Sequence, residues 1–101
     1  MRMLMKVSIP VEAGNKAIKD GTLPKTMLGF VERFKPESAF FTAENGKRTG
    51  FFVFDMKEPS LIPSIAEPFF INLNAEITMS PVMNLEDMKV GVERAMKEGI
   101  G

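Results

Sequence analysis

ESAFFTAENGKRTGFFVFDM, residues 37–56, is the stretch of sequence that decides the fold. Two runs rich in aromatic and β-branched residues flank Asn45-Gly46, a dipeptide that readily adopts positive φ and therefore suits a two-residue type I′ hairpin turn. The turn fixes the predicted cross-strand pairs, which are Glu44 with Lys47, Thr42 with Thr49, Phe41 with Gly50 and Phe40 with Phe51. Because side chains alternate between the two faces of a strand, this register assigns every residue of the hairpin to a face.

Both faces of the predicted hairpin carry apolar side chains. One face is wholly apolar and consists of Ala39, Phe41, Ala43, Phe52, Phe54 and Met56. The other face is mixed and consists of Ser38, Phe40, Thr42, Thr49, Phe51, Val53 and Asp55. A hairpin of this kind needs two covers, one of which can come from another chain.

The remaining chain predicts two more strands and a set of helices. Residues 2–9 and 75–80 alternate between apolar and polar side chains and predict half-buried strands. Residues 22–34 and 61–73 each carry a single apolar stripe with helical spacing. The polar segment 12–20 fits a short helix or an irregular loop equally well.

Three residues indicate where helices are interrupted, begin or end. Pro68 lies inside the second stripe, so a bend or an early end is expected there. Asn84 is a suitable N-cap for a last helix over residues 85–96, and Gly99 is a natural C-cap.

The element order is therefore βαββαβ with an extra C-terminal helix, in one domain over residues 1–101. With right-handed crossovers and one antiparallel four-stranded sheet, the predicted architecture is α+β and ferredoxin-like, with strand order 4-1-3-2. Helices cover one face of this sheet, and the opposite face remains open. The open face is predicted to be a homodimer interface formed by Leu4, Lys6, Phe40, Phe51, Val53 and Asp55.

This arrangement resembles the dimeric α+β barrel superfamily, in which two sheets pack through their open faces. The phrases GNKAIKDGTLPK, GKRTGFFVFDM and IAEPFF also resemble a set of small bacterial proteins of unassigned function. In enzymes of the superfamily the pocket lies between sheet and helices, and many need neither metal nor flavin. The nearest types are monooxygenases acting on polycyclic quinols, lactone isomerases and haem-degrading enzymes, many of whose sites depend on histidine, tyrosine or tryptophan.

The amino-acid composition limits the kinds of catalysis and metal binding that the chain can support. The chain has no cysteine, histidine, tryptophan or tyrosine, so thiolate chemistry and the commonest general base and metal ligand are excluded. We therefore expect no metal and no cofactor. The N-terminal segment does not fit a signal peptide, and no stretch fits a membrane span, so a cytoplasmic protein without a membrane partner is expected.

An RNA-recognition domain shares the βαββαβ order and exposes stacking aromatics on its central strands. In this chain Phe51 matches one such position, but Leu4 and Lys6 stand where another aromatic would be expected. The formal charge of zero also argues against a nucleic-acid partner.

The candidate site residues follow from the same pattern. A small apolar ligand would be lined by Phe52, Phe54, Phe69 and Phe70, although core packing explains the same residues. Glu67, beside Pro68, is the candidate catalytic acid if the helix bend turns it into a cavity; otherwise it lies on a solvated face. Lys6 and Asp55 are expected to form ion pairs within or between chains.

Two functions remain open. One is non-catalytic binding of a small apolar ligand or a protein partner by a homodimer. The alternative is a cofactor-free enzyme, similar to a monooxygenase or isomerase, acting on a hydrophobic organic acid or a quinone-like substrate. Whether the protein is an enzyme is not decided by its sequence.

Overall fold

The computed structural model describes residues 1–99. Its elements, in chain order, are β1 (Arg2–Ile9), α1 (Val11–Lys19), α2 (Thr22–Phe34), β2 (Ser38–Glu44), β3 (Lys47–Asp55), the 3₁₀ turn η1 (Pro59–Leu61), α3 (Ile62–Leu73), β4 (Glu76–Pro81) and α4 (Leu85–Lys97). The predicted βαββαβ order with a C-terminal helix is confirmed. The segment left open between helix and loop is helical and forms α1.

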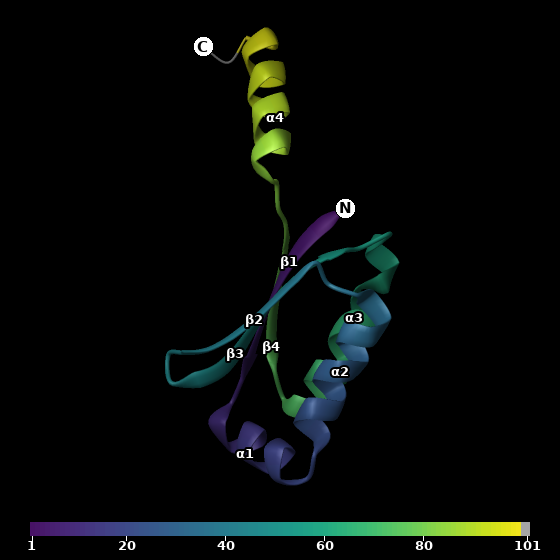
Figure 1. Cartoon of the computed structure of the whole chain (residues 1–101), viewed down its shortest axis with the longest axis vertical. Helices are drawn as coiled ribbons and strands as arrows, with labels where there is room; N and C mark the ends of the chain where they lie inside the picture. Colours follow the sequence, from purple (N-terminus) through teal and green to yellow (C-terminus); the bar gives the residue numbers. More distant parts are fainter. Residues whose placement is uncertain (100–101) are drawn as a thin grey trace.

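The four strands form one antiparallel sheet in the order β2-β3-β1-β4, which is the predicted order 4-1-3-2. Helices α2 and α3 lie on one side of the sheet, and within residues 1–99 no helix lies against the other side (Figure 1). The single chain is therefore an open α+β sandwich of one sheet and one helical layer.

The hairpin has the register that the turn predicts. The observed pairs include Glu44 with Lys47, Thr42 with Thr49, Phe41 with Gly50 and Phe40 with Phe51. Asn45 and Gly46 have φ angles of 54° and 75°, as a type I′ turn requires. Local turn chemistry thus sets the face that each hairpin residue occupies.

The core lies between the sheet and the α2–α3 layer, and Phe30 of α2 is at its centre. The ring centroid of Phe30 lies 4.9 Å from that of Phe52, 5.3 Å from that of Phe54 and 5.8 Å from that of Phe69. The three partner side chains are at most 1% exposed. Alternate residues of β1 complete the buried face, namely Met3, Met5, Val7 and Ile9.

Phe41 is not covered, although it lies on the predicted face. Its ring packs over Gly50, where a Cβ atom would approach it to 3.4 Å, yet the side chain is 61% exposed. The reason is that β2 is an edge strand, and the β2–β3 hairpin reaches past the helical layer (Figure 1). Ala39 and Ala43 are exposed for the same reason.

Helix α3 continues through Pro68 to Leu73, so the helix does not end early. Proline removes the hydrogen bond to the carbonyl oxygen of residue i−4, which here is Ser64. Ser64 is exposed, and water can satisfy its carbonyl oxygen without ending the helix.

Helix α4 forms where the sequence predicts it, and its N-terminus is closed by a capping box. The backbone N–H of Asp87 donates to Oδ1 of Asn84 over 2.8 Å, and that of Asn84 donates to Oδ2 of Asp87 over 3.2 Å. The helix projects beyond the end of the sheet, away from α1, α2 and α3 (Figure 1). None of its residues is buried.

Candidate functional site

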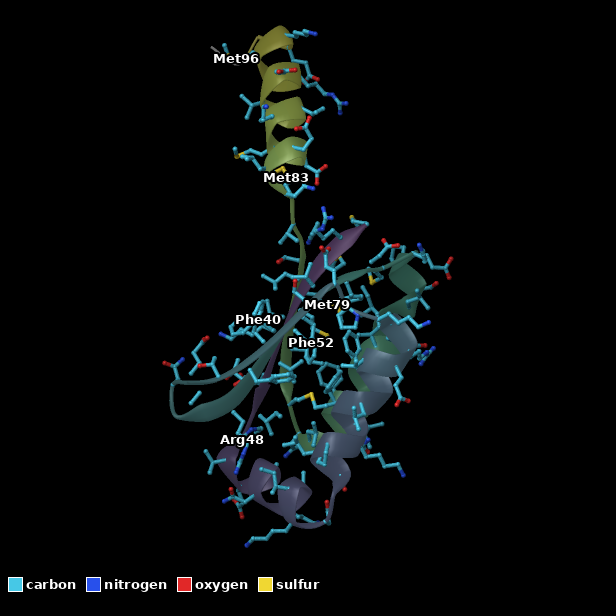
Figure 2. The ribbon with its side chains drawn as sticks, viewed as in Figure 1. Phe40, Arg48, Phe52, Met79, Met83 and Met96 are labelled. Atoms are coloured by element: carbon cyan, nitrogen blue, oxygen red, sulfur yellow. The ribbon has the colours of Figure 1, made fainter. Side chains whose placement is uncertain are left out.

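Three of the four phenylalanines predicted to line a ligand pocket fill the space between the sheet and the helices. Phe52, Phe54 and Phe69 belong to the packed cluster around Phe30, and Phe52 points from the sheet toward the helices (Figure 2). Phe70, the fourth predicted lining residue, is 42% exposed on α3. The four phenylalanines therefore do not come together around one cavity.

A groove of about 520 Å³ instead runs between α2 and α3, outside the aromatic core. Its apolar floor is made by Phe30, Phe34, Ile65, Pro68 and Phe69. Its remaining lining is polar or small and consists of Thr22, Lys25, Thr26, Gly29, Arg33, Ser64 and Asn72. Of the residues predicted from the sequence for a ligand pocket, only Phe69 lines this groove.

Small and polar residues leave the groove open. On α2 the residues at Thr22, Thr26, Gly29 and Arg33 follow helical spacing and share one face. On α3 the facing line is Ser64, Pro68 and Asn72, spaced four residues apart. A Cβ atom at Gly29 would meet nothing within 4 Å, so α2 leaves open space at this point of the groove.

The two helices are joined by one side-chain hydrogen-bond chain inside the groove. The amide of Asn72 donates to Oγ1 of Thr26 over 3.3 Å, and that hydroxyl donates to the carbonyl oxygen of Thr22 over 2.8 Å. Thr26 is buried, so these bonds satisfy its hydroxyl and fix the spacing of α2 and α3 at this point.

Positive charge lies on the α2 side of the groove. Lys25 and Arg33 are both exposed, and neither forms an ion pair within residues 1–99. The guanidinium carbon of Arg33 lies 4.9 Å from the ring centroid of Phe34, which is cation–π distance. The lining residues include no carboxylate, so an anion entering the groove meets attraction from two cations and no opposing acid.

Glu67, the candidate acid, is exposed on α3 and is not one of the groove-lining residues. It lies between Ala66 and Pro68, and only the proline faces the groove. The structure therefore offers no desolvated position for this carboxylate.

The open sheet face combines an apolar centre with a charged end. Leu4, Phe51 and Val53 are half-buried, whereas Phe40 is 69% exposed on the side away from the helices (Figure 2). Lys6 forms an ion pair with Glu44 across the sheet. The predicted interface residues thus share one face, where Lys6 lies on the central strand β1 opposite Phe51 and Asp55 lies at the end of β3.

Asp55 forms its ion pairs within the chain, with the ammonium group of Met1 at 2.6 Å and with Lys57. The hydrogen bond from Lys57, followed by that from the N-terminal ammonium group, lowers the pKa of Asp55 from its ordinary 3.8 to about 2. Lys6 and Asp55 therefore do not pair with each other, and both charges have partners in a single copy.

This lowered pKa predicts an acid-dependent contribution to stability. Because the folded pKa of Asp55 lies below that of the unfolded chain, its contribution is present above about pH 4 and is lost as the pH falls toward about 2. We expect Asp55→Asn to be less stable than the unmutated chain near neutral pH, with the difference shrinking at acidic pH. Urea unfolding across this pH range measures the difference, and high salt should reduce it because Asp55 is exposed. A difference that stays constant with pH would contradict the assignment.

No group of three or more acidic side chains that could hold a metal ion occurs within residues 1–99. Over the same residues, no helix combines the length and the apolar character needed to cross a membrane.

Comparison with known proteins adds no assignment. No protein-family model matches the chain, and no curated protein matches it in sequence.

Proposed function

We propose that the protein is a homodimeric binding protein and that its α2–α3 groove takes a small apolar anion, such as a fatty acid or an aromatic carboxylate. The observation that carries this proposal is the pairing of an aromatic floor with two unpaired cations in one groove. A volume of about 520 Å³ also lies within the range of small-molecule sites, roughly 300–1,000 Å³.

The lining determines how such a ligand would lie. Its apolar part would rest on the rings of Phe30, Phe34 and Phe69, and its carboxylate would approach Lys25 or Arg33. A planar guanidinium can hold a carboxylate through two parallel hydrogen bonds, which gives Arg33 the larger expected contribution. Binding is favoured over catalysis because the groove contains no carboxylate or histidine for proton transfer.

The dimer is proposed to form through the open sheet face, as in a dimeric α+β barrel. The apolar centre of this face, Leu4, Phe40, Phe51 and Val53, has no helix over it within residues 1–99. A stable interface of this kind should bury on the order of 1,200–2,000 Å² in total. The helical layer lies on the opposite side of the sheet, so the two grooves of the dimer would remain accessible (Figure 1).

Filling the groove tests ligand binding directly. Gly29→Leu places a side chain in open space on the groove wall and should leave the helix intact, since leucine favours helices more than glycine does. Titration with 8-anilinonaphthalene-1-sulfonate, an apolar aromatic anion, and competition with dodecanoate should show at least about tenfold weaker binding than for the unmutated chain.

Gly91→Leu is the matched control for this experiment. Gly91 is also a mid-helix glycine with nothing within 4 Å of a Cβ atom, but it lies on α4, away from the groove. The control should bind both anions as the unmutated chain does. Equal affinities for the two leucine variants would show that the groove is not the binding site.

The charge of the ligand is tested by a second pair of variants. Arg33→Ala should weaken dodecanoate binding and reduce its dependence on salt, whereas Lys19→Ala, which changes an exposed cation on α1, should not. Equal binding of dodecanoate and dodecanol by the unmutated chain would contradict recognition of the carboxylate.

A further inference from the structure

Helix α4 is amphipathic, and no other element within residues 1–99 packs on its apolar side. Its apolar stripe is Leu85, Met88, Val92, Ala95 and Met96. Four of these side chains are 45–70% exposed, at Leu85, Met88, Val92 and Met96. A helix of 13 residues is marginal in water by itself, so its stability depends on a surface that covers this stripe.

The connection from β4 leads α4 past the end of the sheet (Figure 1). Only Val82, Met83 and Asn84 separate the two elements, and the backbone N–H of Val82 still donates to the carbonyl oxygen of Arg2 over 3.1 Å. Arg2 also contacts Asp87 of α4, with Nη1 and Oδ2 separated by 3.4 Å. These two contacts hold the connection and the first turn of α4 against Arg2 of β1. The helix therefore begins at the end of the sheet and runs on away from it.

The spacing of the stripe indicates what kind of surface it fits. Leu85, Met88, Val92 and Ala95 are separated by three, four and three residues, which is the spacing of a narrow coiled-coil seam. The partner is therefore expected to be another helix. The charges of α4 are balanced, with three acidic and three basic residues over Leu85–Lys97, which does not suit an anionic membrane surface.

The C-terminal end of the stripe, at Met96, lies on the same side of the molecule as the open sheet face (Figure 2). Met96 lies on the left of α4 in Figure 2, the side on which Phe40 extends from the sheet, whereas Phe52 and the helical layer lie to the right. A second copy that covers the open face would therefore also stand opposite α4. The second copy could cover the stripe with its own open face or with its own α4. The charged end of the open face carries Lys6, Glu44 and Glu76, so it is a poor match for an apolar stripe.

We propose that α4 pairs in parallel with α4 of a second copy, seam against identical seam, and forms the second part of a two-part dimer interface. This inference rests on the open-face dimer proposed above. A two-fold axis along the length of the molecule brings the two open faces together and places both α4 helices at the same end. Each seam residue then faces its own counterpart, and both apolar surfaces are covered by one partner.

Two valines of α4 provide a matched test. Val92 lies in the seam and is 53% exposed, whereas Val90 lies on the polar face and is 48% exposed. In a single copy both substitutions, Val92→Glu and Val90→Glu, place a carboxylate at a half-exposed position of α4. Sedimentation across a concentration series should show that Val92→Glu raises the dimer dissociation constant at least about tenfold, while Val90→Glu leaves it unchanged. Equal dissociation constants for the two variants would overturn the proposal.

Cysteine cross-linking tests which element of the partner is contacted. Because the chain has no cysteine, Val92→Cys can form a disulfide only with another copy. In a parallel pair the two introduced thiols face each other, so mild oxidation should give a covalent dimer, and Val90→Cys should not. Failure of Val92→Cys to cross-link would overturn the pairing of α4 with α4, even if Val92→Glu weakens the dimer.

The same experiments separate this inference from the open-face dimer. If Phe51→Glu gives a monomer and Val92→Glu does not weaken the dimer, the open-face interface stands and the α4 pairing is wrong. If Val92→Glu weakens the dimer, Val92→Cys cross-links and Phe51→Glu leaves the dimer intact, the α4 pairing stands and the open-face interface is wrong.

Discussion

Replacing Phe51 by glutamate is expected to leave the chain as a monomer or to make it insoluble. Phe51 lies on β3 at the apolar centre of the open face, opposite Phe40 of β2 and Lys6 of β1. In the proposed dimer its ring is covered by the second copy, and a carboxylate there would be buried in an apolar surface beside Lys6, whose charge is already paired with Glu44. Light scattering at micromolar concentration measures the outcome.

Phe41→Glu is the control for this substitution. Phe41 belongs to the same hairpin and is 61% exposed, but it lies on the helix side of the sheet and not on the proposed interface. The Phe41→Glu variant should therefore remain dimeric. If Phe51→Glu is as dimeric as Phe41→Glu, the open face is not the interface.

Phe52→Ala is expected to destabilise the chain by roughly 3–5 kcal/mol, the range for emptying a buried phenylalanine site. Phe52 is fully buried, and its ring centroid lies 4.9 Å from that of Phe30 and 6.4 Å from that of Phe69. Removing the ring would leave a cavity among these side chains. Urea unfolding measures the loss. For a domain of this size it is a large part of the total stability, so thermal unfolding should shift by many degrees.

Phe41→Ala is the matched control for the core substitution. Both rings belong to the helix-side face of the hairpin, and their centroids are 5.7 Å apart. Because the ring of Phe41 is largely exposed, its removal should cost no more than about 1 kcal/mol. A cost close to that of Phe52→Ala would mean that Phe41 is covered in solution, by a second copy or by another partner.

Local patterns in the sequence predict most of the fold. Asn45-Gly46 specifies the turn and hence the register of the hairpin, and the alternation in β1 specifies which of its residues enter the core. Strand order follows because right-handed crossovers leave few alternatives for βαββαβ. These features depend on near neighbours in the chain, and the structure confirms each of them.

Whether an apolar surface is buried depends on distant parts of the chain. The sequence pattern predicts burial at two places where the structure shows exposed side chains. Phe41 has the same pattern as Phe52, but α2 and α3 stop short of the edge strand and leave Phe41 exposed. The apolar stripe of α4 likewise predicts burial, yet the chain runs past the end of the sheet after β4 and α4 lies away from the core. A hydrophobic pattern shows that a face needs a cover and does not show what supplies it.

The candidate site was only partly predictable. The aromatic residues of the sequence correctly indicate Phe69 as a lining residue of the groove. The groove itself depends on small and polar residues that leave space between the two helices. The signal was present in the spacing of Thr22, Thr26, Gly29 and Arg33, a polar line beside the apolar stripe of α2. Pairing this line with Ser64, Pro68 and Asn72 requires knowing how α2 and α3 face each other.

The mass of the unmutated chain in solution is the most direct measurement of the proposed assembly. Multi-angle light scattering at micromolar concentration should give twice the 11.2 kDa of one chain, because both the open sheet face and the seam of α4 need a second copy as cover. A mass of 11.2 kDa at that concentration would show that a single copy is stable with both surfaces in water, and it would contradict the homodimer.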